Sequence, residues 1–383
     1  MPVNYQIGGS NFEDTFIRRD LFAQGGLWMW GLGGGGQLGN NSNSGTSSPI
    51  QTIAAGTNWK QVDISSSFHS AAIKTDGTLW LWGQNSVGQL GDNTVTNNAS
   101  PIQTISGGTN WKQVAVNRRN TAAIKTDGTL WTWGINSNGQ LATGDTTNRS
   151  SPGQTISAGA NWKLVAIGNY HMAAVKTDNT LWLWGYAGYG ELGTGAGGGS
   201  STPVQTVSAG TDWRLVSCGH YCTFAIKTDG TLWTWGHNSV GQLGDNTRTN
   251  RSSPVQTASA GTNWKQVSSK NRQAAAIKTD GTLWLWGLND YGQLGDNSNT
   301  NKSSPVQTVA GGTNWKYVSA GISSTAGIKT DGTLWLWGLS SSGQLGNNAQ
   351  SPNISSPIQT VAAGTNWKQV STGYTTGAIK DDF

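Results

Sequence analysis

One sequence unit recurs seven times along the chain and constrains its fold more than any other feature. The string Leu-Trp-x-Trp-Gly begins at seven leucines, and successive copies start 51 or 52 residues apart. A second string, Trp-Lys/Arg-x-Val, recurs with the same period, and the two strings together contain all 21 tryptophans. The first string begins at Leu27, Leu79, Leu130, Leu181, Leu232, Leu283 and Leu334, and the second at Trp59, Trp111, Trp162, Trp213, Trp264, Trp315 and Trp367. A fixed period of this length predicts that each copy folds as one supersecondary unit.

Each unit predicts four short antiparallel strands. The dipeptide Asp76-Gly77 between the second and third strands is a hairpin signal, because glycine accepts the positive φ of a tight turn. Asp178-Asn179 replaces it in one copy, and asparagine also tolerates positive φ. A proline such as Pro101 is expected to begin the fourth strand, which suits an outer edge where no N–H is required. The strands expected in one copy are 59–64, 70–74, 78–82 and 101–105.

Seven four-stranded units indicate an all-β fold, a seven-bladed β-propeller of antiparallel blades. Sheets that are apolar on both faces must be covered on both faces, and blades packed around an axis cover one another. An open solenoid would instead need polar end caps. The last copy stops after its second strand, so we expect residues 27–30 and 49–53 to complete that blade and close the ring. Residues 27–383 then form one propeller domain, preceded by an extension of residues 1–26.

The repeat resembles that of a known family. The stretch Gly168–Gly185, and the strings Asn-x-x-Gly-Gln-Leu-Gly at Asn85, Asn238 and Asn289, are similar to the regulator of chromosome condensation repeat. The resemblance covers residues 27–383 and implies a seven-bladed propeller. It also implies kinship with a eukaryotic nucleotide exchange factor that docks on chromatin, with bacterial propellers that inhibit β-lactamases, and with repeats encoded by bacteriophages. Residues 11–22 look like the leader of a phage-encoded member.

The seven copies differ mainly on one face of the predicted disc. Turns between second and third strands, and connections from fourth to first strands, are nearly constant, whereas the loops of the opposite face vary. A constant frame with variable loops is typical of binding proteins, although unconstrained drift of the loops is the alternative. The abundance of Arg, Tyr and His near the axis favours binding. The candidate partner-binding residues are Phe68, His69, Arg118, Arg119, Tyr170, His171, His220, Tyr221, Lys270, Arg272 and Tyr374.

Residues 1–26 are expected to join the ring on the constant face, opposite the variable loops. This geometry favours a non-enzymatic virion component of a phage, such as a decoration, fibre or host-recognition protein. Its partners would be other virion proteins through residues 1–26, and a protein or cell-surface glycan through the variable face. The alternative is a soluble protein-binding inhibitor or scaffold, and third comes an exchange factor or chromatin binder. The anchor residues would be Phe12, Phe16, Arg18, Arg19 and Phe22.

The expected location is the virion, with the cytoplasm as the alternative, because no signal peptide is visible. We also expect no membrane span, since no apolar run approaches 20 residues. The net charge of +5 does not predict nucleic-acid binding, because 14 of the 24 Lys and Arg residues belong to the constant repeat positions.

Catalytic, metal and cofactor chemistry is not expected. Glu13 and Glu191 are the only glutamates, so paired carboxylates are lacking, and no Ser-His-Asp arrangement stands out. Cys218 and Cys222 are expected to be free thiols, while a disulfide, or a metal site with His220, stays open as an alternative.

Overall fold

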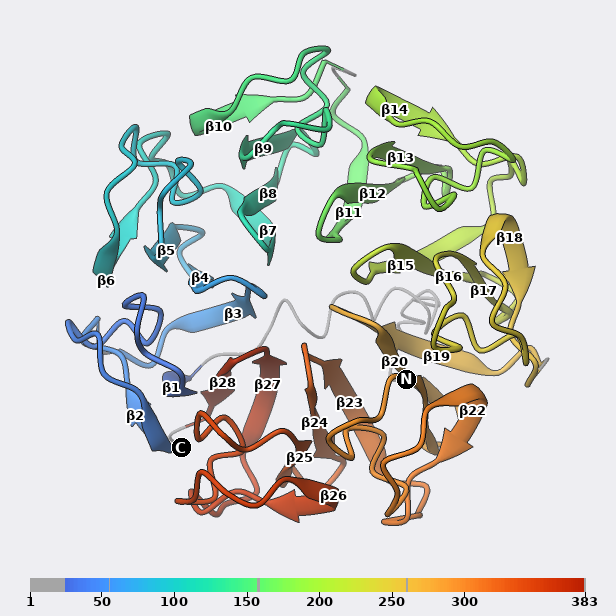
Figure 1. Ribbon diagram of the computed structural model, residues 1–383. Coiled ribbons are helices and arrows are strands. Elements are labelled where there is room, and N and C mark those ends of the chain that lie inside the picture. The colour runs from blue at the N-terminus through green and yellow to red at the C-terminus, as the bar shows by residue number, and fades with distance from the viewer. Residues whose placement is uncertain (1–24, 55, 157–158, 260, 382–383) are drawn as a thin grey trace, which may run out of the picture.

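Seven four-stranded antiparallel sheets form a closed ring in the computed structural model, which describes residues 25–54, 56–156, 159–259 and 261–381 (Figure 1). We number the blades 1 to 7 in the chain order of their innermost strands. In blades 1 to 6 the four strands follow one another outward in chain order. Blade 1 contains β3 (Trp59–Ile64), β4 (His69–Lys74), β5 (Leu79–Gly83) and β6 (Asn98–Gln103), and blade 2 contains β7 (Trp111–Asn117), β8 (Asn120–Lys125), β9 (Leu130–Gly134) and β10 (Arg149–Gln154). Blade 3 contains β11 (Trp162–Ile167), β12 (His171–Lys176), β13 (Leu181–Gly185) and β14 (Ser200–Gln205), and blade 4 contains β15 (Trp213–Cys218), β16 (Cys222–Lys227), β17 (Leu232–Gly236) and β18 (Arg251–Gln256). Blade 5 contains β19 (Trp264–Ser268), β20 (Gln273–Lys278), β21 (Leu283–Gly287) and β22 (Lys302–Gln307), and blade 6 contains β23 (Trp315–Ala320), β24 (Ser324–Lys329), β25 (Leu334–Gly338) and β26 (Ile354–Gln359).

Blade 7 joins the two ends of the chain and confirms the predicted closure. It contains β27 (Trp367–Thr372), β28 (Thr375–Lys380), β1 (Gly26–Gly31) and β2 (Thr46–Gln51). Leu27 pairs with Ile379 in the antiparallel ladder between β1 and β28, and Figure 1 shows blue β1 beside red β28. Residues 32–374 of the chain therefore lie between two strands that share a sheet.

The outermost strands correct one detail of the prediction. β6 begins at Asn98, three residues before Pro101, so the proline does not start the strand. The ladder between β5 and β6 pairs Leu81 with Ile102 and Gly83 with Asn98, and its register shifts between these pairs. Pro101 lies in this irregular stretch of an edge strand, where a missing N–H removes no ladder hydrogen bond.

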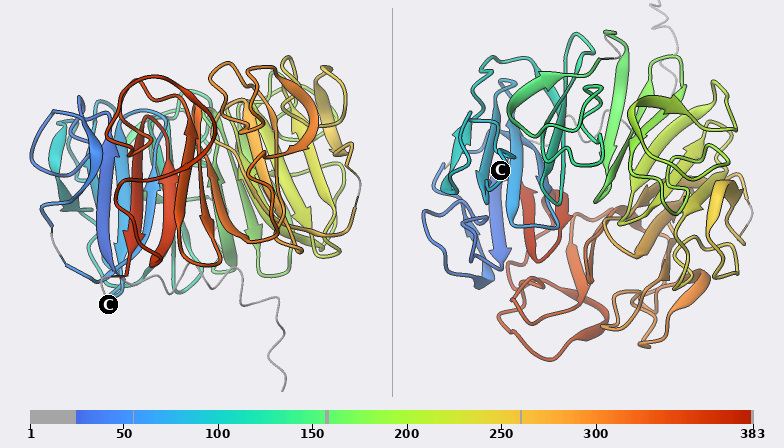
Figure 2. Two further views of the ribbon diagram at one scale, coloured as in Figure 1. Left: turned by 90° about the horizontal axis from the view of Figure 1, so that it is seen from below. Right: turned by 45° about the horizontal axis from the view of Figure 1, so that its top comes forward.

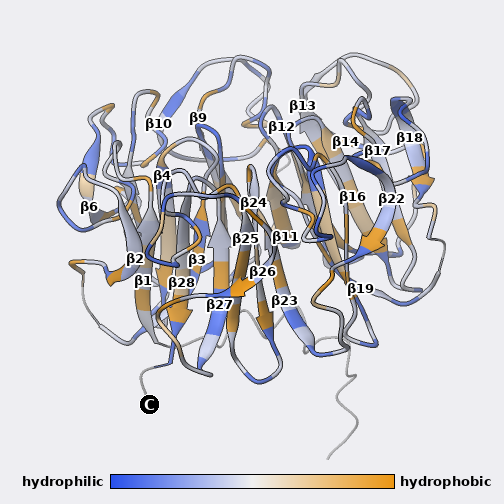
Figure 3. Cartoon of the chain, turned by 60° about the horizontal axis from the view of Figure 1, so that its bottom comes forward, coloured by the Kyte–Doolittle hydropathy of each residue, from blue (hydrophilic) through white to orange (hydrophobic). Residues whose placement is uncertain are grey.

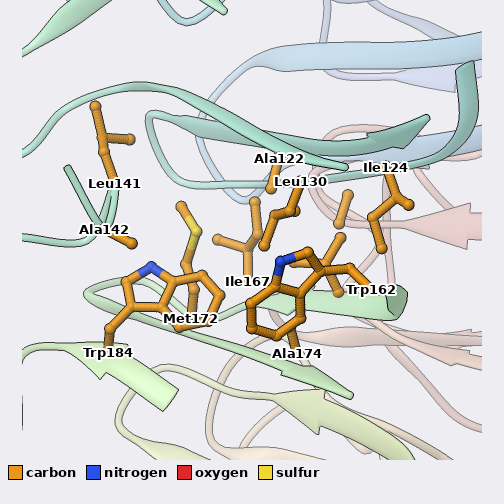
Figure 4. Close-up of a cluster of buried hydrophobic side chains, with 12 residues drawn as sticks. Ala122, Ile124, Leu130, Leu141, Ala142, Trp162, Ile167, Met172, Ala174 and Trp184 are labelled. Carbon is orange, nitrogen blue, oxygen red and sulfur yellow. The ribbon is translucent and has the colours of Figure 1, made fainter. Parts of the chain in front are cut away.

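The hydrophobic core lies between neighbouring blades. Trp162 and Trp184 of blade 3 pack in one buried cluster with Leu130 and Leu141 of blade 2 (Figure 4). Across the same interface, the Trp184 indole N–H donates a hydrogen bond of 2.7 Å to the backbone carbonyl of Gln140. The same bond, at 2.7–2.9 Å, links each pair of neighbouring blades, through Trp82–Gln37, Trp133–Gln89, Trp184–Gln140, Trp235–Glu191, Trp286–Gln242, Trp337–Gln293 and, at the closing interface, Trp30–Gln344.

The inner edges of the blades are joined by glutamine side chains around the axis. Gln113 of β7 donates from Nε2 to the Val165 carbonyl (3.1 Å), and its Oε1 accepts the Val165 N–H (3.2 Å). An edge strand otherwise leaves such groups unpaired, so the side chain of one blade satisfies the backbone of the next. Leu164 and Ala166 face the axis at the interface of blades 3 and 4, and in the described chain no side-chain hydrogen bond of this kind crosses there.

The turns between second and third strands carry one repeated network. Asp76 Oδ1 accepts the Thr78 N–H (2.9 Å) and hydroxyl (2.7 Å), and that hydroxyl oxygen accepts the Trp80 indole N–H (2.9 Å). Gly77 has a φ of +80° and Asn179 a φ of +62°, which confirms the predicted turn chemistry. Each lysine that ends a second strand lies over two tryptophan rings, as Lys74 does over Trp59 and Trp80 at 4.8 Å. The ammonium groups of these lysines therefore contact tryptophan rings within the constant face.

The disc therefore has two unlike faces. Figure 2 shows the C-terminal end on the side opposite the long loops that follow the third strands. In Figure 3 the hydrophobic segments lie within the strands, and the loops are mostly hydrophilic. Gly25, the first described residue, pairs with Trp59 at the start of β3, so the described chain enters the ring on the constant face. Within the described ranges, no helix is long and apolar enough to cross a membrane.

We predict that Gln113→Leu lowers the free energy of unfolding by about 1 kcal/mol, because Val165 loses the partners of both its backbone groups. Urea unfolding followed by tryptophan fluorescence measures the change. Leu215→Met is the matched control, since Leu215 holds the same repeat position in β15 and its volume is conserved. Equal stability of Gln113→Leu and the parent chain would show that the axial glutamines do not hold the blades together.

Candidate functional site

Six aromatic side chains of two adjacent blades gather on the variable face. They include four of the eight tyrosines and two of the four histidines of the chain. We call them the aromatic cluster: Tyr170, Tyr186 and Tyr189 of blade 3, and His220, Tyr221 and His237 of blade 4. They come from the loops that follow β11, β13, β15 and β17, so two loops of each blade contribute.

The rings of the aromatic cluster are packed against one another. Tyr170 and Tyr221 lie parallel, with centroids 5.0 Å apart and planes 3° apart, and His220 stacks on Tyr221 at 4.2 Å. The Tyr189 ring meets the Tyr221 ring edge-on, with centroids 5.1 Å apart, and lies tilted against the His237 ring at 4.7 Å. Tyr189 is 39% exposed. Aromatic pairs of this kind contribute about 0.5–1.5 kcal/mol each beyond the burial of area. The cluster is thus an ordered aromatic surface on the variable face.

Arg118 extends the cluster from blade 2. Its guanidinium carbon lies 4.1 Å from the centroid of the Tyr170 ring. Arg118 has a φ of +44°, a backbone conformation that residues other than Gly, Asn and Asp rarely adopt. The Arg118 N–H donates to Ser66 Oγ (3.1 Å) and to Asn117 Oδ1 (2.9 Å), which holds this turn in place. Strained backbone held in this way is found mostly at functional sites.

Burial and the arginines keep the two histidines of the cluster uncharged. Burial lowers the pKa of His220 to about 4, and the Arg272 and Arg118 charges lower it as well. Burial, followed by the Arg272 charge, also lowers the pKa of His237. Gln242 Nε2 donates to His237 Nδ1 at 2.8 Å, so the His237 proton resides on Nε2. At neutral pH the positive charge of this surface therefore belongs to arginine.

Glu191 lies buried beneath the tyrosines, at a position where the other six blades hold glutamine. Its Oε2 accepts the Tyr189 N–H at 2.9 Å, as Gln89 Oε1 accepts the Val87 N–H at 3.0 Å. Its second oxygen, Oε1, is buried without a hydrogen-bond partner. Burial raises the pKa of Glu191 to about 7, although the two backbone hydrogen bonds lower it in part. When protonated, Glu191 has the same shape as the glutamine that it replaces.

The structure removes two of the predicted residues from the partner-binding surface. His69 and His171 have no exposed area, and burial lowers the pKa of His69 to about 4 and that of His171 to about 3. Their Nε2 atoms lie 3.3 Å from Thr121 Oγ1 and 2.9 Å from Thr223 Oγ1, each in the next blade. Both side chains therefore join blades and cannot contact a partner.

Lys270 also has an internal role. Its ammonium group crosses the axis from blade 5 and donates to Asp63 Oδ1 (2.7 Å), to Ser371 Oγ (2.8 Å) and to the Ile64 carbonyl. The axial cavity that these groups line has a volume of about 190 Å³. Lys270 thus closes this cavity near the variable face, and little of its side chain is free for a partner.

The remaining predicted residues lie in different places. Phe68 and Tyr374 stack at 6.1 Å on the loops of blades 1 and 7, and they form a separate pair. Arg119 follows Arg118 in the same turn and is half-buried, and Arg272 lies in the loop after β19. The predicted anchor residues Phe12, Phe16, Arg18, Arg19 and Phe22 lie outside the described residues.

Sequence reasoning missed Tyr186, Tyr189 and His237, because its candidates came only from the loops near the axis, between first and second strands, whereas these three follow third strands. A signal was present in the copies themselves. Blade 3 reads Tyr-Ala-Gly-Tyr at residues 186–189, where blade 1 reads Gln-Asn-Ser-Val at residues 84–87. The missing asparagine and the two added tyrosines mark this loop as different.

The cysteines are free and buried, which answers the question that the sequence left open. Burial raises the pKa of Cys222 to about 12, and that of Cys218 is raised further, so neither thiol is reactive. In the part of the chain that the structure covers, no three His, Cys, Asp or Glu side chains are grouped to hold a metal ion.

Comparison with known proteins identifies close sequence relatives of this chain. A family model described as the RCC1-like domain matches residues 108–379, and the regulator of chromosome condensation (RCC1) repeat matches residues 24–73 and 76–124. The ultraviolet-B receptor UVR8 of Arabidopsis thaliana is 32% identical over 324 residues, which are 83% of this chain and 73% of that protein. The mitochondrial RCC1 domain-containing protein RUG3 of Arabidopsis thaliana is 28% identical over 354 residues, 84% of this chain and 79% of that protein.

Solved structures share the fold at much lower sequence identity. Yeast RCC1 (Prp20), bound to Kap60, has a TM-score of 0.84 at 17% identity and covers 99% of this chain and 94% of its own. Human WBSCR16 has a TM-score of 0.81 at 18% identity and covers 93% of this chain and 100% of its own. At such identities these structures bear on the fold alone.

We predict that Glu191→Gln makes the ring more stable at pH 8 and leaves it nearly unchanged at pH 4. The folded chain holds the Glu191 proton up to a pKa of about 7, above the ordinary value of 4.5. The parent therefore loses stability as the pH rises from about 4.5 to 7, by roughly 3 kcal/mol for a fully buried carboxyl, and the variant does not. Urea unfolding at several pH values measures the difference.

Gln140→Glu, at the same repeat position of blade 2, is the control and should introduce the same pH dependence. Parallel stability curves for the parent and Glu191→Gln would show that Glu191 does not titrate in this range.

Proposed function

This chain belongs to the family of RCC1-like propellers, and from that premise we propose that it is a non-catalytic binding protein whose aromatic cluster docks a partner. The observation that carries the proposal is the gathering of six aromatic side chains on two adjacent blades of one face. Seven nearly identical copies need no such gathering to fold, since the other blades close the ring without it. Tyrosine is enriched among the residues that dominate binding energy at interfaces.

Two further observations support a docking face. Tyr189 is 39% exposed, although it packs against three other rings, so it offers apolar area without loss of order. Arg118 is held over Tyr170 in a left-handed conformation. An ordered aromatic surface loses little side-chain entropy on association, which favours affinity.

A protein is the partner class that the relatives favour. The yeast relative is seen bound to the protein Kap60, and a second structure of Prp20p concerns its binding to Gsp1p and histones. These partners belong to those proteins, and they support for this chain only the general class. A cell-surface glycan is the second class of ligand for the same face.

We propose further that this chain acts on a phage virion, with residues 1–26 as the attachment to other virion proteins. The support is geometric, because Gly25 joins the ring beside Trp59 on the face opposite the aromatic cluster. A ring attached in this way turns its docking face outward. A protein-binding inhibitor or scaffold that acts away from a particle, for example in the cytoplasm, is the alternative setting.

Density-gradient fractionation of the source lysate tests the setting. We expect the full chain to co-migrate with intact particles, and a chain without residues 1–24 to fold but leave the particle fraction. Recovery of the full chain only as a small species would overturn the virion setting and leave the docking face to be tested separately.

Replacement of Tyr189 by serine tests the docking face. We predict that Tyr189→Ser weakens partner capture by the full chain roughly tenfold or more, since an interface anchor is lost. Tyr291→Ser is the matched control, because Tyr291 holds the same repeat position in blade 5 and is 38% exposed. Capture from host-envelope extract by the immobilised chain, quantified by mass spectrometry, is the measurement. Equal losses in both variants would place docking elsewhere.

A further inference from the structure

Two arginines of different blades approach the aromatic cluster from opposite sides. Arg118 comes from the turn between β7 and β8 in blade 2, and Arg272 comes from the loop between β19 and β20 in blade 5. Arg118 lies 4.1 Å over the ring of Tyr170, which is itself 5.8 Å from the ring of His220. The His220 N–H donates to the carbonyl of Asn271, the neighbour of Arg272, at 3.0 Å. His220 therefore lies between the loops that carry the two arginines, and the charges of both arginines act on it.

These two arginines lack a carboxylate partner in the described part of the chain. Other arginines of the same face do pair, as Arg149 does with Asp145 at 2.6 Å and Arg251 does with Asp245 at 2.8 Å. The carboxyl group that contacts the cluster is Glu191, which is buried and whose pKa burial raises to about 7, so it is fully ionised only above neutral pH. Like charges that approach one another without a counter-charge favour the binding of an anion.

The surrounding groups fit an anion as well. Guanidinium groups bind carboxylate, phosphate and sulfate through charge-assisted hydrogen bonds. His237 carries its proton on Nε2, since Gln242 donates to its Nδ1, and the phenol groups of the tyrosines supply further donors. The parallel rings of Tyr170 and Tyr221 offer apolar contact beside the charge.

We propose that Arg118, Arg272 and the aromatic cluster form a binding site for an anionic group carried by the protein partner. This inference rests on the proposed function and names the chemistry that the docking face recognises. The partner segment would place its carboxylate or phosphate between the two arginines and its apolar atoms against the tyrosines. The site spans blades 2 to 5, although its rings come from blades 3 and 4 alone.

His220 reports on the site. The charged and titratable groups around it are Arg118, Arg272, His171, His237, Tyr170 and Tyr221, and the Asn271 side chain accepts a hydrogen bond from it. An anion between the arginines cancels the repulsion that opposes protonation, so the pKa of His220 should rise when the anion binds. This readout needs no knowledge of the natural partner.

The test is NMR titration of the histidine side chains in the full chain, with sodium sulfate as the probe and sodium chloride at equal ionic strength as the reference. We expect sulfate to raise the pKa of His220 in a saturable way, and the sulfate affinity to fall at least fivefold in Arg118→Gln and in Arg272→Gln. Arg119→Gln is the matched control, because it removes the same charge from the adjacent residue of the turn. The dispersion of the methyl signals verifies that each variant is folded.

A response to sulfate no larger than that to chloride would overturn the anion site. Equal losses in Arg119→Gln and Arg118→Gln would overturn it too, since they would indicate only the general field of the face. If the anion site holds but Tyr189→Ser leaves partner capture unchanged, the docking proposal fails while the site remains.

Competition between probes identifies the source of the anion. A glutamate-rich peptide and a sulfated oligosaccharide of equal charge are titrated against the full chain. Stronger binding of the peptide supports an anionic group on a protein, and stronger binding of the oligosaccharide overturns that source in favour of a glycan.

Discussion

The hydrogen bond from a tryptophan indole to a backbone carbonyl of the preceding blade is the contact on which the ring depends. It occurs at every interface between blades, including the closing bond from Trp30 to Gln344. At the interface of blades 1 and 2, the same carbonyl, that of Gln89 in blade 1, also accepts the hydroxyl of Thr121 in blade 2 at 2.8 Å. The glycine that ends Gly-Gln-Leu-Gly packs closely on the ring, because a Cβ on Gly91 would lie 2.7 Å from Trp133 Nε1. Blade 2 accommodates Ala142 at this position and keeps the bond from Trp184 to Gln140 at 2.7 Å. The Gly-Gln-Leu-Gly string therefore supplies both the carbonyl that accepts the indole hydrogen bond and the glycine against which the tryptophan ring packs.

The interface between blades 3 and 4 combines several departures from this regular frame. Leu164 and Ala166 stand there in place of axial hydrogen-bonding side chains, and Glu191 replaces a glutamine. The aromatic cluster lies over the same interface. The apolar Leu164 and Ala166 remove axial hydrogen bonds between the blades, whereas the indole bond from Trp235 to the Glu191 carbonyl is retained at 2.7 Å. A closed ring tolerates such local losses because the other interfaces keep its geometry, and functional sites often reduce stability in this way.

The fold could be predicted from local patterns, but the orientation of single side chains could not. Tryptophan spacing, Asp-Gly turns and the truncated last copy suffice for strand order and closure, since each is a short-range signal. The start of β6 before Pro101 depends on an irregular ladder with β5, which no local pattern reveals. His69 was predicted to bind a partner because the repeat places it beside a loop of the variable face. The repeat does not reveal that the neighbouring blade, through Thr121, covers its side chain. The contact of Lys270 with Asp63 joins residues 207 positions apart across the axis, so only the closed ring shows it.

The charge next to the aromatic cluster also depends on contacts between blades. His220 and His237 are neutral near pH 7, because burial and the neighbouring arginines oppose their protonation. The charge next to the aromatic cluster is therefore supplied by Arg118 and Arg272, from the two blades that flank it. The proposed anion site takes its arginines from blades 2 and 5 and its rings from blades 3 and 4, and β1 and β28 close the ring that holds these blades together. Recognition on this face is thus a property of the assembled propeller, although each of its residues belongs to a separate copy of one repeat.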